Sequence, residues 1–187
     1  MTYRKGNYYH IYNRGCNKEL IFFNDRNYKY LINRMEQTIS FYNVKMIAYC
    51  LLPNHYHFLM KQISDNPISN WLRNLFNPYT QKVNAEIGRS GTLFEGRPKN
   101  ILIDKEEYLA HLIRYIHYNP VKAGLVDSPE EWKYSNYLEW IGKKKSLLFD
   151  EETLKYVFGD FHEYESFVSD YHISRELENE IGKYTLE

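Results

Sequence analysis

Two strand patterns joined by a tight turn constrain the fold of this chain most. Residues 44–52, VKMIAYCLL, form an apolar run, and residues 55–62, HYHFLMKQ, alternate in polarity. Pro53 and Asn54 lie between the two patterns, and this pair favours a turn. The stretch therefore predicts an antiparallel hairpin whose first strand is buried.

Further patterns place this hairpin within a mixed order of strands and helices. Alternation predicts two more strands, at residues 7–15 and 91–103. Apolar residues at helical spacing predict three helices, at residues 24–42, 66–88 and 104–119. The order is β-α-β-β-α-β-α. The predicted class is therefore α+β: a ferredoxin-like βαββαβ antiparallel sheet with helices on one face, followed by a final helix.

Proline and glycine predict breaks in three of these elements. Pro78 predicts an interruption of the second helix, and Asn119-Pro120 predicts the end of the third. Gly96 and Pro98 predict an irregular middle in the last strand.

The charge of the chain changes sign near residue 126. The formal net charge is zero, but residues 1–125 carry 17 basic and 9 acidic side chains, whereas residues 126–187 carry 7 and 15. A basic body is typical of a protein that binds a polyanion, most often nucleic acid. We therefore expect a catalytic or binding domain over residues 1–126 and an acidic helical extension over residues 127–187.

Two roles are open for the extension, whose helical patterns lie around residues 129–141 and 150–172. It could fold over the basic body and limit access of DNA, as opposite charges would favour. It could instead supply packing helices, with Trp132, Tyr137 and Trp140 as apolar anchors.

Nothing in the composition predicts a membrane or secreted protein. No stretch approaches the roughly 20 apolar residues that span a bilayer. The N-terminus has basic residues but no long apolar core behind them, so no secretory signal is predicted. The two cysteines, Cys16 and Cys50, fit a reducing cytoplasm.

The second strand of the hairpin carries two histidines, His55 and His57. Residues two apart on a strand point to one face, so the two imidazoles project together while Tyr56 and Phe58 point away. Such a pair suits a shared metal ion, or it is a half-buried polar pair on a sheet. A metal site would need a third ligand from elsewhere.

The helix predicted at residues 104–119 offers that ligand. Its core stripe consists of Leu109, Leu112, Ile113 and Ile116. A second, polar-aromatic stripe consists of Tyr108, His111, Tyr115 and Asn119. If this helix packs near the hairpin, Asn119 provides a carbonyl oxygen and Tyr115 stands one turn away. Alternatively, Tyr115 is one of 19 tyrosines and merely packs.

Two segments carry a family resemblance. PNHYHFLM together with YLAHLIRYIHYNPVKAGLV resembles the Y1-type HUH transposases, which include the IS200/IS605-like and REP-associated tyrosine transposases. YYHIYNRGCNKELIF and GTLFEGRPKNILI also resemble that family, particularly its REP-associated branch. The resemblance covers about residues 7–126, with its motifs in the expected order.

The resemblance implies the fold, the substrate and the site. It implies metal-dependent cleavage and strand transfer of single-stranded, hairpin-forming DNA through a covalent 5′-phosphotyrosine. His55 and His57 would be metal ligands, Asn119 the third ligand and Tyr115 the nucleophile. The ion would be divalent, Mg²⁺ or Mn²⁺, and the protein a monomer or homodimer.

Basic residues of the body are candidates for contacts to DNA phosphates, which position a strand. These are Arg14, Arg73, Lys82, Arg89, Arg97, Lys99 and Lys122. Two other functions stay open. One is a metal-dependent hydrolase in which the histidines activate water. The other is a catalytically silent or domesticated DNA-binding protein.

Overall fold

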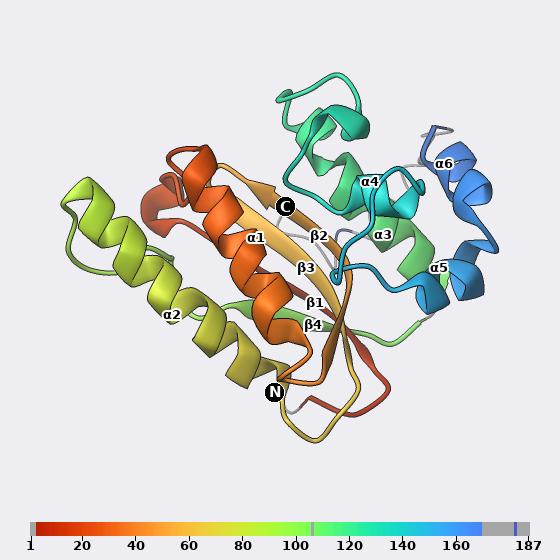
Figure 1. Ribbon diagram of the computed structural model, residues 1–187, viewed down its shortest axis with the longest axis horizontal. Helices are drawn as coiled ribbons and strands as arrows, with labels where there is room; N and C mark the ends of the chain where they lie inside the picture. The colour runs from red at the N-terminus through yellow and green to blue at the C-terminus, as the bar shows by residue number, and fades with distance from the viewer. Residues whose placement is uncertain (1–2, 106, 170–181, 183–187) are drawn as a thin grey trace.

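The computed structural model is built on one antiparallel sheet and describes residues 3–105, 107–169 and 182 (Figure 1). Its strands are β1 (Tyr8–Arg14), β2 (Val44–Leu52), β3 (His55–Gln62) and β4 (Lys99–Ile103), in the order β2-β3-β1-β4. Helix α1 (Asp25–Ile39) joins β1 to β2, and α2 (Ile68–Ile87) joins β3 to β4. This arrangement confirms the predicted ferredoxin-like α+β fold.

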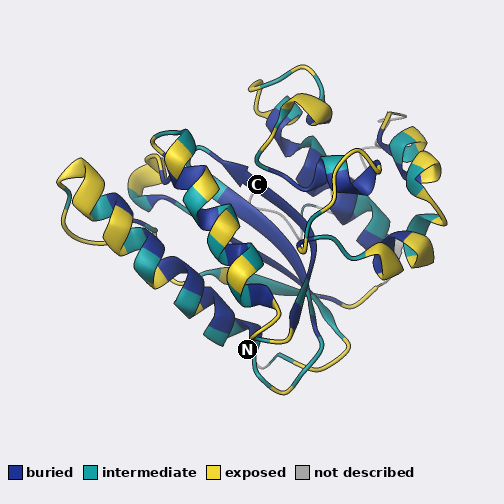
Figure 2. Ribbon diagram, viewed as in Figure 1, coloured by how far each residue is buried: buried dark blue, intermediate teal, exposed yellow. Residues whose placement is uncertain are grey.

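Alternation along the strands divides the apolar core into two parts. Tyr9, Ile11, Tyr56 and Phe58 pack with residues of α1 and α2 on one face of the sheet. Leu59 and its neighbours pack on the other face with residues of α3 (Glu107–Lys122). Figure 2 shows the resulting pattern, in which the strands are largely buried and the outer helix surfaces are exposed. Each face of the sheet can therefore carry its own set of polar side chains.

Helix α3 confirms its predicted core stripe, since Leu109, Leu112, Ile113 and Ile116 are all buried. Its predicted end at Asn119-Pro120 was wrong, because the helix continues to Lys122. A proline in the last turn removes one backbone donor without stopping the helix. The helix ends before Gly124, whose φ of +66° allows the left-handed turn typical of a helix C-terminus.

The predicted interruption of α2 at Pro78 was also wrong, because the helix runs unbroken from Ile68 to Ile87. Pro78 lacks the N–H that would bond the carbonyl of Asn74, four residues earlier. Arg34 of α1 donates from Nη2 to that carbonyl oxygen at 2.9 Å. The neighbouring helix thus replaces the missing bond.

Strand β4 is shorter than the predicted strand at residues 91–103, since only Lys99–Ile103 pair with β1. The predicted irregularity at Gly96 and Pro98 becomes a loop instead. Proline cannot donate to a sheet ladder, which explains why pairing begins only after Pro98. Upstream of the loop, Phe94 makes one isolated bridge with Gly15.

Residues 127–169 pack beside α3 and along the free edge of β2. They contain η2 (Pro129–Glu131), α4 (Tyr137–Trp140), α5 (Glu151–Phe158) and α6 (Phe161–Ser169). Ser135 bridges Cys50, and the indole N–H groups of Trp132 and Trp140 donate to the carbonyl oxygens of Leu51 and Ile47. The segment therefore covers the sheet edge and adds to the core, in agreement with the packing role. The predicted pattern at residues 170–172 lies outside the described residues.

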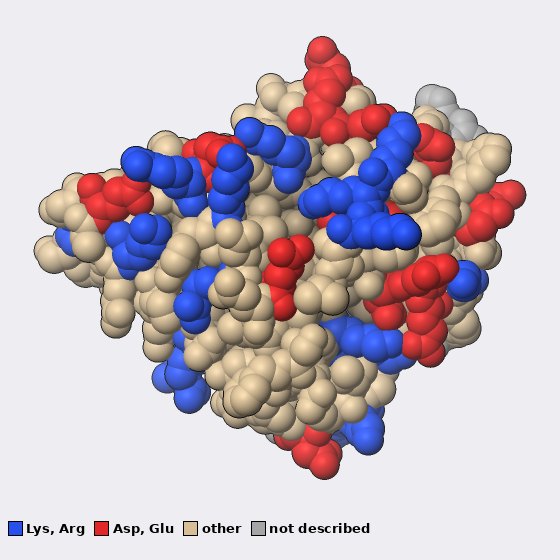
Figure 3. Space-filling view, viewed as in Figure 1, with Lys and Arg blue, Asp and Glu red and all other residues tan. Residues whose placement is uncertain are grey.

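Charge pairs also join the extension to the body. Lys45 of β2 contacts Asp150 at 2.9 Å and Glu152 at 2.7 Å, and Lys133 contacts Asp25 at 2.8 Å. Figure 3 shows acidic and basic side chains interleaved on the face that carries α1 and α2. Part of the basic charge of residues 1–125 and of the acidic charge of residues 126–187 is therefore neutralised by these pairs. No helix in the described part of the chain is long and apolar enough to cross a membrane.

Asn136 fixes the extension to the sheet through a fully buried amide. Its Oδ1 accepts from the backbone N–H of Tyr49 at 2.8 Å and lies 2.8 Å from Nε2 of His117. Its Nδ2 donates to the carbonyl oxygens of Ile47 and Leu148, both at 3.0 Å. One side chain thus completes the hydrogen bonding of β2, α3 and the loop before α5.

We expect Asn136→Ala to lower the free energy of unfolding by about 3–5 kcal/mol, because it leaves several buried partners unpaired at about 1–3 kcal/mol each. Urea denaturation measures this change. Asn77→Ala, at an exposed position of α2, is the matched control and should change stability by less than about 0.5 kcal/mol. A loss below 1 kcal/mol in Asn136→Ala would contradict this role.

Candidate active site

The predicted histidine pair lies on the sheet face that α3 covers. In the register, Tyr12 of β1 pairs with His57 and Arg14 pairs with His55. His10 lies two residues before Tyr12 and therefore points to the same face. The rings of His55 and His57 are 5.1 Å apart. The prediction that the two imidazoles project together is confirmed.

His57 is fully buried and has one ring nitrogen without a partner. Its Nδ1 lies 3.0 Å from Nε2 of His10, whereas its Nε2 has no hydrogen-bond partner. If Nδ1–H of His57 donates to His10, Nε2 of His57 carries a lone pair. Burial, followed by the nearby His10 and His55, lowers the pKa of His57 well below its usual value. A neutral imidazole with a free lone pair is the form that binds a metal ion.

His55 is held in a similar way by its chain neighbour. Its Nδ1 lies 2.6 Å from Oδ1 of Asn54. An amide oxygen only accepts, so Nδ1 carries the proton and Nε2 keeps the lone pair. Burial lowers the pKa of His55 to about 4, whereas the nearby side chain of Asn119 in α3 acts in the opposite direction. The structure therefore brings Asn119 to the histidine pair, as the sequence predicted.

Tyr115 lies against the same pair. Its ring meets that of His57 edge to face, with centroids 5.7 Å apart, and the side chain is almost entirely buried. Nζ of Lys122 lies 5.4 Å from the Tyr115 ring centroid. Arg114 points elsewhere, because its Nη1 donates to the carbonyl oxygen of Phe167 in α6 at 3.1 Å. Lys122 thus places a positive charge beside this tyrosine.

His10 is a site residue that the sequence analysis did not select. Its side chain is fully buried, and its ring stacks on that of His57 with centroids 5.2 Å apart. A signal for it was present, because His10 and Tyr12 alternate on β1 as His55 and His57 do on β3. Sequence alone does not give the strand order that places β1 next to β3.

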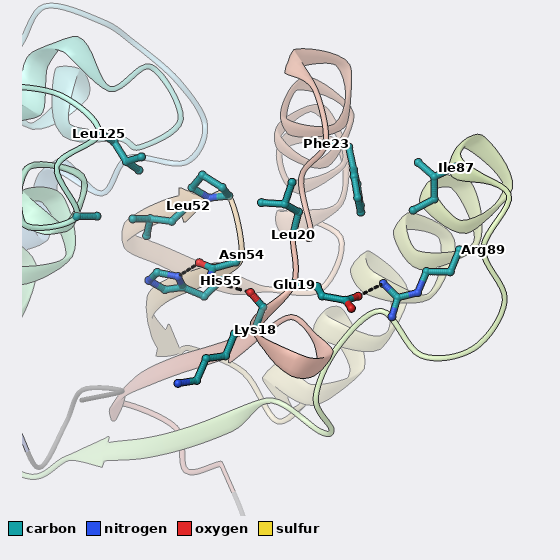
Figure 4. Close-up of a pocket in the computed structure, with 12 residues that line it drawn as sticks. Lys18, Glu19, Leu20, Phe23, Leu52, Asn54, His55, Ile87, Arg89 and Leu125 are labelled. Atoms are coloured by element: carbon teal, nitrogen blue, oxygen red, sulfur yellow. Dashed lines mark hydrogen bonds and ion pairs between the residues drawn. The ribbon is translucent and has the colours of Figure 1, made fainter.

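An open cavity of about 710 Å³ gives access to His55 (Figure 4). Four partly exposed apolar side chains contribute to its wall: Leu20, Phe23, Ile87 and Leu125. Lys18 and Arg89 add positive charge, and Nη1 of Arg89 lies 3.2 Å from Oε2 of Glu19. His55 is therefore reachable from a groove large enough for a sizeable ligand, whereas His57 lies fully buried behind it.

The candidate DNA-contact residues fall on both faces of the sheet. Lys122 and Arg14 lie near Tyr115 and His55, and Lys99 pairs with Tyr12 in the register. Arg14 forms an ion pair with Glu95, so its charge is partly neutralised. Arg73 and Arg97 line a different cavity, and Lys82 lies over the ring of Tyr30. The histidine face therefore holds only part of the predicted set.

The donor set fits a divalent cation. Two neutral imidazoles and one amide carry no charge, so an ion bound there would keep its full charge. The described residues contain no group of three or more His, Cys, Asp or Glu side chains arranged to hold a metal. The amide of Asn119 is the side chain that would complete such a donor set, as the resemblance implies.

Fold and site together define a class of protein: a ferredoxin-like sheet with a buried histidine pair facing a tyrosine of the adjoining helix. Comparison with known proteins gives the family, because residues 4–119 match the family described as "Transposase IS200 like". The chain belongs to the IS200-like transposase family, which confirms the resemblance read from its motifs.

Individual relatives agree with this assignment. The chain is 30% identical, over 113 residues, to a Haemophilus influenzae protein provisionally named a REP-associated tyrosine transposase. That match covers 54% of this chain and 64% of the relative, slightly less than two thirds of its length. A solved structure of a REP-associated tyrosine transposase bound to a REP hairpin has a TM-score of 0.64 at 18% identity, covering 80% of this chain and 92% of that one. The latter likeness shows a shared fold.

Proposed function

We propose that this protein cuts and rejoins single-stranded DNA through a covalent bond to Tyr115. The observation that carries the proposal is the buried His57, whose Nε2 lacks a hydrogen-bond partner and whose ring meets that of Tyr115 edge to face. His55 and Asn119 complete a neutral set of nitrogen and oxygen ligands, which admits Mg²⁺, Mn²⁺ or another divalent ion. When bound, the ion would neutralise charge on the oxygens of the scissile phosphate.

The residues of the chain account for the remaining chemistry. The phenolic oxygen of Tyr115 attacks the phosphorus, and the bond from phosphorus to the 3′ oxygen breaks. The products are a 5′-phosphotyrosine and a DNA end with a free 3′-OH. Attack by a 3′-OH on the phosphotyrosine reverses the step and rejoins DNA. Lys122 supplies positive charge beside the nucleophile, with its Nζ 5.4 Å from the Tyr115 ring centroid.

The proposed substrate is DNA with a hairpin and unpaired flanks. The related structure contains a REP hairpin, and this chain shares its fold. Lys18, Lys99 and Lys122 lie near the histidine face and supply positive charge for a phosphate backbone. Salt should therefore weaken binding steeply.

A cleavage assay tests this proposal. Hairpin oligonucleotides from the DNA flanking the gene, labelled at either end, are incubated with the protein and Mg²⁺ or Mn²⁺, then run on a denaturing protein gel. We expect a protein band that carries only the 3′ label and disappears with a chelator. Cleavage without any protein-linked DNA would instead indicate a hydrolase that activates water.

His10 is expected to be a positioning residue for His57. Residues that orient a metal-bound imidazole typically contribute 10- to 100-fold to metal affinity, so His10→Ala should weaken Mn²⁺ binding by that amount. Isothermal titration calorimetry measures the affinity, and His10→Gln should restore part of it because its amide oxygen can accept from Nδ1–H of His57. His162→Ala, an exposed position on α6, is the control. A folded His10→Ala protein with unchanged Mn²⁺ affinity would contradict the role.

A single chain holds the complete set of proposed site residues. Tyr115 contacts His57, and Asn119 contacts His55, within one molecule. We therefore expect each chain to act alone, whether the protein is a monomer or a homodimer. Mixing Tyr115→Phe with His57→Ala should then restore no covalent product. Restored product in the mixture would show that two chains exchange their tyrosines.

A further inference from the structure

A second cavity, of about 630 Å³, lies on the sheet face opposite the histidine pair. Tyr56 of β3 and Asn100 of β4 contribute to its floor, and Phe94, Gly96 and Arg97 to its wall. Helix α2 provides a further side that includes Arg73. Nothing in the proposed chemistry at Tyr115 uses this cavity.

Two buried polar atoms at the cavity lack partners. The hydroxyl of the fully buried Tyr56 has no hydrogen-bond partner. Asn100 is only partly buried, but its Oδ1 atom is also shielded from solvent and without a partner. The Tyr56 ring is held in place by Phe76, whose centroid lies 4.6 Å away. Buried polar atoms almost always have a partner, so two unpaired polar atoms from residues that line one cavity indicate a polar ligand. A nucleobase edge carries both donors and acceptors.

The charge of the cavity favours an anion. Arg73 and Arg97 are both exposed and line it from two sides. No carboxylate is among the described lining residues, and neither arginine has an ion pair within the part of the chain that the structure describes. Arginine forks match phosphate oxygens, so a nucleotide phosphate suits this position.

Aromatic rings complete the match to a nucleotide. Phe94 is only partly buried, and its ring meets Phe76 edge to face with centroids 5.2 Å apart. Tyr3 also lines the cavity and is half-buried. Unpaired bases stack on such exposed ring faces with little dependence on sequence.

The cavity lies at the same end of the sheet as the proposed active site. Tyr56 stands between His55 and His57 on β3, so its side chain projects to the opposite face at the same level. Neighbouring residues of β1 also point to opposite faces at this level. Asn13 lines the cavity, whereas Arg14 pairs with His55. A single strand that turns around this end of the sheet would reach both faces.

We propose that this cavity binds one unpaired nucleotide of the DNA strand that is cut at Tyr115. Arg73 and Arg97 bind its phosphate, Phe94 stacks on the base, and Tyr56 with Asn100 bonds the base edge. The identity of the ligand rests on the proposed function, whereas the binding test below does not require cleavage.

The test measures DNA affinity of the full chain in a chelating buffer. The probe is a labelled hairpin with unpaired flanks, together with a series in which each unpaired nucleotide in turn is abasic. For the original protein, we expect one abasic position to weaken binding by about tenfold or more, as loss of base stacking does. In Tyr56→Phe and Phe94→Ala, that penalty should shrink to less than about threefold.

Matched variants separate base recognition from charge. Arg73→Ala and Arg97→Ala should weaken binding and lower its salt dependence, whereas Tyr156→Phe and Arg26→Ala, away from the cavity, should keep the tenfold abasic penalty. Equal abasic penalties in the original protein and in the Tyr56 and Phe94 variants would overturn the proposal. An effect confined to the two arginines would also overturn it, since it would show binding of phosphate alone.

The outcome is separable from that of the proposed chemistry. If the abasic pattern appears but no covalent product forms with Mg²⁺ or Mn²⁺, the proposal for the cavity stands and the role of Tyr115 fails. If covalent product forms but the abasic pattern is unchanged in the variants, the cavity proposal alone fails.

Discussion

Tyr115→Phe is expected to reduce covalent protein–DNA product by at least about 1,000-fold, the largest change that a single atom of this chain should cause. The substitution removes the phenolic oxygen that would attack phosphorus and leaves no other nucleophile in its place. The aromatic ring remains, so its edge-to-face packing on His57 is kept. DNA affinity should therefore change by less than about threefold.

The neighbouring Tyr118 provides the matched control for this substitution. It lies on the same helix and is only partly buried, and the proposed mechanism does not use it. Tyr118→Phe should form covalent product at the original rate. Denaturing gels quantify the product, and fluorescence anisotropy measures the affinity. Covalent product retained by Tyr115→Phe would remove this tyrosine from the mechanism.

A shortened chain that ends at Val126 is expected not to fold. The described extension buries Trp140, Leu154 and Tyr164 against α3 and β2, each with at most 1% of its surface exposed. Large buried side chains typically contribute about 3–5 kcal/mol each, whereas a whole domain is stable by about 5–15 kcal/mol. Removing several of them costs more free energy of unfolding than the remaining core provides.

Circular dichroism and thermal denaturation test this expectation. The shortened chain should show no cooperative transition, whereas the full chain should show one. If the shortened chain instead unfolds cooperatively and binds DNA more tightly at low salt, the extension is a removable cover over the basic body. That result would favour the other role that the charge division suggested.

The sheet could be predicted from sequence because strand patterns and turns are local signals. The boundaries of β2 and β3 agree with the apolar run and the alternation on either side of Pro53. The missed features depended on tertiary contacts. Where α2 continues through Pro78, Arg34 of another helix bonds the carbonyl oxygen left unpaired, and no local pattern indicates that contact.

The candidate site was predictable where two residues share one element. His55 and His57 share a face by strand geometry, and Tyr115 and Asn119 are one helical turn apart. The prediction that Asn119 joins the histidines depended on α3 packing near the hairpin. The structure places Asn119 close to His55, as that prediction required. His10 was missed because its role depends on the pairing of β1 with β3.

The basic residues were predicted least well, since charge alone does not assign a side chain to a face. Arg73 and Arg97 belong to the cavity opposite the histidines, whereas Lys122 lies over Tyr115. Arg14 is paired with Glu95 and so offers less free charge than its position suggested.

Peptide mapping of the covalent product tests the central claim most directly. The protein is incubated with the hairpin DNA and Mn²⁺, digested with nuclease and protease, and analysed by mass spectrometry. The account predicts a single modified peptide that carries a nucleotide through its 5′ phosphate on Tyr115. A nucleotide attached to any other side chain, or cleaved DNA with no modified peptide, would contradict it.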